Sequence, residues 1–111
     1  MSKDWRAYAA HILDAIDKLD RIQQRGSIIV DDILYDAALR NLQTLAESTQ
    51  KLPDGLKARY AEIAWTKIVG FRNIIVHNYL GNIDPQTVIR VIDEHIQPLR
   101  SAVAAMLAGE D

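Results

Sequence analysis

The chain of 111 residues contains no cysteine. Disulfide bonds, thiolate metal sites and thiol nucleophiles are therefore excluded, and the fold must be held together by packing. No stretch approaches the roughly 18 consecutive apolar residues of a membrane-spanning helix, and residues 1–5 lack the apolar segment of a secretory signal peptide. We therefore expect a cytoplasmic protein that does not associate with membranes.

The chain also lacks the strong positive charge of proteins that hold long nucleic acids by electrostatic attraction alone. Its formal net charge is −2 at pH 7 and its isoelectric point is near 5.9. The charge is unevenly distributed, because residues 54–81 carry a net charge of +2 and the remainder sums to −4. Any contact with RNA is therefore expected to be local.

An ordinary globular composition, with 49% hydrophobic and 25% charged residues, indicates one domain over residues 1–111. Apolar residues recur at intervals of three and four, the period of an amphipathic helix. The pattern predicts helices over residues 5–24, 33–51, 56–63 and 65–80, with a last helix that begins at residues 84–85. The predicted fold class is all-α, an up-and-down four-helix bundle plus a short extra helix.

Turn-forming and capping residues mark the first helix boundaries. Gly26 is a candidate left-handed cap for the first helix. The β-branched run at residues 27–30 has no second strand to pair with, so we expect a loop that tucks its apolar side chains under the bundle. Asp31 and Asp32 then favour the start of the second helix, since carboxylates are stabilised at a helix N-terminus.

The later helices contain one glycine and two prolines that need an explanation. Gly70 lies inside the fourth helix, where glycine costs about 1 kcal/mol, so it is expected to allow close approach of another helix or of a bound phosphate. Asp84 and Pro85 are typical of a helix start. Pro98 removes a helical hydrogen bond, so we expect a kink near residues 94–95.

Arg72, Asn73, His77 and Tyr79 form a polar cluster within an otherwise apolar run. At 100° per residue, Tyr79 returns to within about 20° of Arg72 if the helix continues that far. His77 points about 140° away from Arg72 and shares its face with Asn73, whose amide can steady the ring. Residues 81–82, Gly and Asn, are a stop signal, so the helix can instead end near His77.

The spacing Arg, four residues, His, one residue, Tyr resembles the signature of the HepT-like toxins of the HEPN superfamily. These bacterial and archaeal proteins are paired with a minimal nucleotidyltransferase antitoxin of the MntA type. Trp65, the Gly-Phe pair at residues 70–71 and Asn73 strengthen the resemblance, which covers nearly the whole chain. The chain departs from many relatives in the second helix, where their Gly-Glu pair is replaced by Ala46 and Glu47.

The resemblance implies a homodimer that cleaves RNA without a metal or cofactor, using Arg72 and His77 with Asn73 and Glu47 in support. The chemistry is consistent with this role, because histidine exchanges protons near neutral pH and arginine grips phosphate oxygens. The alternative is structural. His77 then only hydrogen-bonds within the bundle, and Arg72 pairs with an acid such as Glu47.

The resemblance also suggests that Tyr79 accepts AMP, which the antitoxin transfers from ATP. An attached phosphate would add negative charge beside Arg72 and block the site for RNA. A half-buried tyrosine is more commonly a core residue with a tethered hydroxyl. For the chain as a whole, the alternative function is a non-catalytic helical partner or substrate-binding subunit of a nucleotidyltransferase.

Other kinds of catalytic site have little support in the sequence. His11, His77 and His95 are far apart, and only Asp93 and Glu94 beside His95 could form a weak surface metal site. There is no glycine-rich phosphate loop, nucleophile elbow or pair of catalytic carboxylates. We therefore expect no metal site and no ability of the chain to transfer AMP itself.

Overall fold

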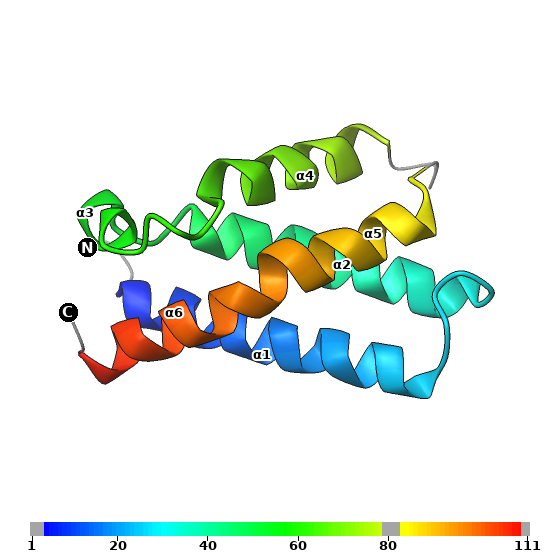
Figure 1. The fold of residues 1–111 in the computed structure, drawn as a ribbon, viewed down its shortest axis with the longest axis horizontal. Helices are drawn as coiled ribbons and strands as arrows, with labels where there is room; N and C mark the ends of the chain where they lie inside the picture. Colours follow the sequence, from blue (N-terminus) through cyan, green and yellow to red (C-terminus); the bar gives the residue numbers. More distant parts are fainter. Residues whose placement is uncertain (1–3, 79–82, 110–111) are drawn as a thin grey trace.

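The computed structural model describes residues 4–78 and 83–109 (Figure 1). Over these ranges the chain forms helices and turns with no β-strand. The elements are α1 (Trp5–Arg25), α2 (Asp32–Thr49), α3 (Asp54–Ala58), α4 (Trp65–His77), α5 (Pro85–Val91), the π-helical turn η1 (Ile92–Ile96) and α6 (Gln97–Ala108). The predicted all-α fold class is confirmed.

The long helices run alternately up and down the molecule, and α5, η1 and α6 together form the last of them (Figure 1). α1 packs against α2 and α6, while α4 packs against α2 and touches η1. The short α3 lies at the end of the bundle where α1 begins and α6 ends. This is the predicted bundle of four main helices with one short extra helix. No helix in the described ranges is long and apolar enough to cross a membrane.

The core is built mainly from apolar stripes on α1, α2 and the C-terminal helices. Its largest fully buried apolar side chains are Ile12, Ile16, Leu19, Leu45, Val88, Ile92, Ile96, Leu99 and Val103. Burying a side chain of this kind contributes about 1.5–3 kcal/mol to stability. α4 contributes less, because Ile68, Phe71 and Ile75 are its only buried residues. Much of the surface of α4 is therefore left open to solvent.

Carboxylate caps begin α2 and α5, as the sequence predicts. Asp31 accepts hydrogen bonds from the backbone N–H groups of Ile33 and Leu34, at 3.0 and 3.3 Å. Asp84 accepts one from the backbone of Gln86, at 3.0 Å. Each cap satisfies an N–H group that has no partner inside the helix, which is worth about 1 kcal/mol relative to alanine.

Gly26 ends α1 in a different way from the prediction. Its φ of 163° and ψ of −169° make it extended, so the expected left-handed cap is wrong. Its small size matters instead, because a Cβ atom at this position would lie 3.1 Å from Leu34 Cδ1. Gly26 thus allows the chain to pass close to the first turn of α2.

The loop after Gly26 buries less apolar surface than expected. Ile28 is buried, but Ile29 and Val30 are 50% and 84% exposed. The hydroxyl of Ser27 accepts a hydrogen bond from the backbone of Ile29 at 3.2 Å, which closes a tight turn. A turn of this kind points successive side chains in different directions, so only Ile28 can reach the core.

The last helix is distorted just before Pro98. Proline has no N–H to donate to the carbonyl four residues earlier. Residues 92–96 instead form a π-helical turn, and the backbone N–H of Gln97 bonds to the carbonyl of Ile92. The predicted distortion near residues 94–95 is confirmed, in the form of a widened turn.

The predicted third helix is shorter than expected and separate from α4. α3 ends at Ala58, and a series of turns leads to Trp65. The indole N–H of Trp65 lies 3.2 Å from the carbonyl oxygen of Lys57 and 3.1 Å from that of Tyr60. Both carbonyls also accept a backbone N–H, from Tyr60 and Ile63, so the indole adds a further hydrogen bond that ties Trp65 to these turns.

α4 ends at His77, short of the predicted residue 80, and Asn78 caps it. The alternative in which the helix stops near His77 is therefore confirmed. Tyr79 and the stop signal at residues 81–82 lie outside the described residues. The shared face of Arg72 and Tyr79 was inferred for a helix that continues to residue 79, so that inference loses its geometric basis.

Gly70 lies inside α4, and a Cβ atom at this position would meet no neighbouring group within 4 Å. The expected contact with another helix of the same chain is therefore wrong. Gly70 faces open space instead.

We expect Gly70→Ala to raise the free energy of unfolding by about 0.5–1 kcal/mol, because alanine loses less backbone entropy in a helix. Urea unfolding measures the change. Gly26→Ala is the contrasting variant and should give no such gain, since its Cβ would press on Leu34. A loss of stability in Gly70→Ala would contradict the open surroundings of Gly70.

Candidate active site

Arg72 lies on the side of α4 that faces α2, and 30% of its side chain is exposed. Its Nη2 and Nε atoms donate to a single carboxylate oxygen, Oε2 of Glu47 on α2, at 2.8 and 3.1 Å. Charge-assisted hydrogen bonds are short and directional. The pair therefore ties α4 to α2 and fixes the direction of the guanidinium group.

Gln43 completes the surroundings of this carboxylate. Its Nε2 donates to the same oxygen of Glu47 at 3.3 Å, from one helical turn earlier on α2. The hydrogen bond from Arg72 lowers the pKa of Glu47, against the opposing effect of partial burial. Glu47 is therefore ionised at neutral pH. Sequence reasoning missed Gln43, although its four-residue spacing from Glu47 is the signal that could have identified it.

Asn73 holds the guanidinium group from a second direction. Arg72 Nη1 donates to Asn73 Oδ1 at 3.1 Å. The sequence suggested that Asn73 would steady His77, whereas the contact found is with Arg72. Because Asn73 is exposed, it can also reach a ligand that approaches from solvent.

His77 is the last residue of α4 and is exposed. Among the residues that the structure describes, its imidazole has no hydrogen-bond or ion-pair partner. Five residues along a helix turn by about 140° and rise about 7.5 Å, so Arg72 and His77 leave α4 in different directions. One chain therefore does not gather both side chains on one face. Tyr79, the remaining candidate, lies outside the described residues.

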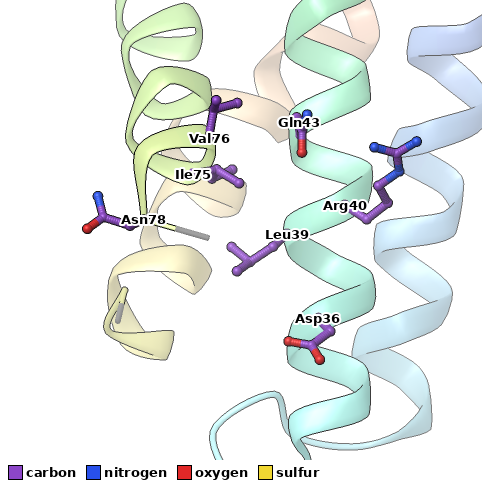
Figure 2. A pocket seen from close by; sticks show the side chains of 7 residues that line it. All are labelled: Asp36, Leu39, Arg40, Gln43, Ile75, Val76 and Asn78. Carbon is purple, nitrogen blue, oxygen red and sulfur yellow. The ribbon is translucent and has the colours of Figure 1, made fainter. Parts of the chain in front are cut away.

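A hollow of about 450 Å³ opens between α2 and the C-terminal end of α4 (Figure 2). It is lined by Asp36, Leu39, Arg40, Gln43, Ile75, Val76 and Asn78. Leu39 points from α2 toward α4, whereas the guanidinium group of Arg40 extends away from α4 (Figure 2). The lining therefore combines the apolar side chains of Leu39, Ile75 and Val76 with polar ones, and Gln43 connects the hollow to Glu47.

The described residues contain no group of three or more histidine, aspartate and glutamate side chains that could hold a metal ion. His11 is exposed on α1, and His95 is half-buried in η1.

Comparison with known proteins identifies the class of protein to which the chain belongs. The family model described as ribonuclease HepT-like matches residues 12–106, from α1 to α6. The chain belongs to the HepT-like ribonuclease family.

Individual relatives are similar over nearly their whole length. A protein of Caldanaerobacter subterraneus subsp. tengcongensis, named as a candidate RNase, is 26% identical over 95% of this chain and 96% of its own. The "Probable ribonuclease HepT" of Thermococcus cleftensis is 25% identical over 90% of this chain and 93% of its own. A candidate RNase of Methanocaldococcus jannaschii is 23% identical over 93% of this chain and 97% of its own. No solved structure gives a significant match.

We expect Glu47→Gln to lower the free energy of unfolding at neutral pH by at most about 1 kcal/mol, because the pair is partly exposed and screened by solvent. Folding lowers the pKa of Glu47. The stability that the ionised carboxylate contributes is therefore present above the ordinary carboxyl pKa, and it is lost as pH falls through the pKa of Glu47 in the folded protein. The difference between wild type and variant in urea unfolding should therefore shrink as the buffer becomes acidic.

Glu62→Gln is the matched control, since Glu62 is exposed and has no ion-pair partner among the described residues. It should leave stability nearly unchanged at every pH. A destabilisation by Glu47→Gln that stays constant from neutral to acidic pH would contradict the ionised pair.

Proposed function

We propose that the protein is an endoribonuclease that cleaves RNA without a metal ion and uses Arg72 and His77 as its catalytic residues. One observation carries the proposal. The guanidinium group of Arg72 is held by Glu47 and Asn73, while the imidazole of His77 on the same helix is exposed and has no partner in the described parts of the chain. Membership of the HepT-like ribonuclease family supports the same activity.

The proposed cleavage is a transfer within the sugar-phosphate backbone of RNA. A base takes the proton of the ribose 2′-hydroxyl, whose oxygen then attacks the adjacent phosphorus. The bond from phosphorus to the 5′-oxygen breaks, and an acid gives that oxygen a proton, which leaves a 2′,3′-cyclic phosphate and a 5′-hydroxyl. His77 serves the proton transfers, and Arg72 stabilises the charge on the pentacoordinate phosphate.

The active unit in this proposal is a two-fold homodimer whose two α4 helices face one cleft. Within one chain, Arg72 and His77 leave α4 about 140° apart. A second protomer can place its imidazole opposite the first protomer's arginine. Ile74, which is 48% exposed on α4, offers apolar surface for such an isologous contact.

We further propose that a nucleotidyltransferase antitoxin silences this toxin by modifying Tyr79. The tyrosine oxygen attacks the α-phosphorus of ATP, pyrophosphate leaves, and the phenolic proton passes to solvent. The proposal depends on the resemblance of residues 72–79 to the family motif. The bound phosphate would compete with RNA for Arg72, since both are anions that arginine binds strongly.

A non-catalytic helical partner of a nucleotidyltransferase is the second candidate function. The ion pair between Arg72 and Glu47 favours it, because a purely structural arginine would make the same contact. The motif would then be a docking or modification surface. Only the first candidate requires RNA cleavage that depends on His77.

The purified protein should cleave labelled RNA in the presence of EDTA, and His77→Ala should reduce the rate by about 10²–10⁴-fold. Because His77 is exposed, the substitution should leave thermal unfolding unchanged. His11→Ala, at an exposed histidine on α1, is the matched control and should retain activity. Intact RNA after incubation with wild type would favour the second candidate.

Light scattering at micromolar concentration should give about twice the chain mass of 12.5 kDa. Ile74→Glu should shift the protein toward monomer and reduce cleavage, since it places a charge in the proposed contact. Ile33→Glu is the control, because Ile33 is 76% exposed at the start of α2. A wild-type protein that stays monomeric contradicts the homodimer.

Incubation with the cognate nucleotidyltransferase and ATP should add one or more AMP groups to the protein, as measured by mass spectrometry. Tyr79→Phe should stay unmodified and keep its nuclease activity, because phenylalanine removes only the acceptor oxygen. It should also escape neutralisation in cells. Modification at another residue, or full silencing of Tyr79→Phe, would mean that the antitoxin acts by binding alone.

A further inference from the structure

A second hollow, of about 430 Å³, lies where the end of α2, α3 and the first turns of α4 meet. It is lined by Gln50, Lys57, Trp65, Thr66, Val69, Gly70 and Asn73. We infer that this hollow binds one nucleotide of the RNA, beside the phosphate that is cleaved, with the base against Trp65. The inference rests on the proposed ribonuclease function and adds a binding site to it.

Trp65 provides a fixed aromatic surface for a base. Its indole N–H is held by the carbonyl oxygens of Lys57 and Tyr60, so the ring cannot turn freely. Proteins commonly bind unpaired bases by stacking them on aromatic rings, and this contact tolerates any base. A ring already fixed in the free protein loses little entropy when a base stacks on it.

Lys57 provides positive charge over one face of the same ring, which leaves the opposite face for a base. Its Nζ atom lies 5.9 Å from the centroid of the Trp65 ring and donates to the carbonyl of Thr49 at 3.1 Å. Its ion-pair partner Asp54, at 3.7 Å, is fully exposed, so solvent screens that pair. Lys57 is therefore placed to attract a phosphate or the face of a base.

The remaining polar groups suit the edge of a base and connect the hollow to the motif. The side chains of Gln50, Thr66 and Asn73 contain both donors and acceptors. No carboxylate lines the hollow. Asn73 is also the residue that accepts a hydrogen bond from Arg72 Nη1, at 3.1 Å. A nucleotide in the hollow therefore has its backbone next to the arginine proposed to bind the phosphate.

Gly70 keeps the hollow open. A Cβ atom at this position would meet nothing within 4 Å, so the chain itself gives no packing reason for the glycine. Without a side chain, a flat base can approach the surface of α4. This accounts for a mid-helix glycine that costs stability, in line with its expected role in close approach of a ligand.

The other hollows fit a nucleotide less well. The hollow in Figure 2 contains the carboxylate of Asp36, which repels phosphate, and none of the residues that line it is aromatic. A hollow between α1 and α2 has the cations Lys18, Arg21 and Arg25, but its other lining residues are aliphatic side chains and an asparagine. The hollow beside Trp65 combines an aromatic ring, a cation and, through Asn73, direct contact with the motif at residues 72–79.

The test uses the full chain with Trp5→Phe, which makes Trp65 the only tryptophan. The probe is a short RNA with 2′-O-methyl groups, which can bind but cannot be cleaved. Binding should quench the fluorescence of Trp65. Gly70→Leu should fill the hollow, abolish the quenching and weaken binding by about tenfold or more, as expected for the loss of one stacked base.

Gly55→Leu is the matched control, because a Cβ at Gly55 also meets nothing within 4 Å and Gly55 does not line the hollow. This control should bind the probe as tightly as the Trp5→Phe protein does. Binding and quenching that survive in Gly70→Leu would overturn the inference. A change of oligomeric state in Gly70→Leu, seen by light scattering, would also overturn it, because the hollow would then be a contact between copies.

The outcomes separate this site from the proposed activity. If the probe binds and quenches Trp65 but all-ribose RNA stays intact, the nucleotide site stands and the ribonuclease function fails. If RNA is cleaved in a His77-dependent way and Gly70→Leu leaves KM unchanged, the function stands and the nucleotide site fails.

Discussion

The contact between Arg72 and Glu47 is the constraint on which the position of the motif depends. α4 buries only Ile68, Phe71 and Ile75, and the chain has no cysteine that could fasten it to the bundle. Apolar packing is non-directional and sets mainly how closely α4 lies against α2. Two hydrogen bonds to one carboxylate oxygen reinforce the rotation of α4 that buries these three side chains, and they fix the direction of the guanidinium group. The directions of all its other side chains follow from that rotation.

This constraint gives the two candidate catalytic residues different properties. Arg72 is oriented before any substrate arrives, and preorganised groups stabilise a developing charge without reorganising during the reaction. His77 lies in the last turn of α4, exposed and with no partner among the described residues, so its ring nitrogens are open to a ligand from solvent. The same geometry directs the two side chains apart, which is why the proposed active unit includes a second protomer. The ion pair is thus compatible with a catalytic arginine as well as a structural one.

The sequence predicted local features well, because they depend on residues close together in the chain. Asp31 caps its helix as expected, and the distortion before Pro98 is found where the missing N–H requires it. The surroundings of the glycines could not be predicted, since whether a Cβ at Gly26 or Gly70 meets a neighbour depends on how helices pack. The pairing of Arg72 with Glu47 was named from the sequence as the structural alternative, and that contact is confirmed, although Glu47 lies 25 residues away and only the fold brings it near.

The number of donors on Arg72 limits what can bind at the motif. Of the five N–H hydrogens of a guanidinium group, one on Nε and one on Nη2 point to Glu47, and one on Nη1 points to Asn73. One hydrogen on each terminal nitrogen remains, and these two are the donors available to a phosphate. The phosphate of a nucleotide beside Trp65 would use these two hydrogens, and the proposed AMP modification would inhibit by competing for the same two. Under the proposed regulation, an antitoxin would not need to distort the fold, because occupying these donors would exclude the RNA phosphate.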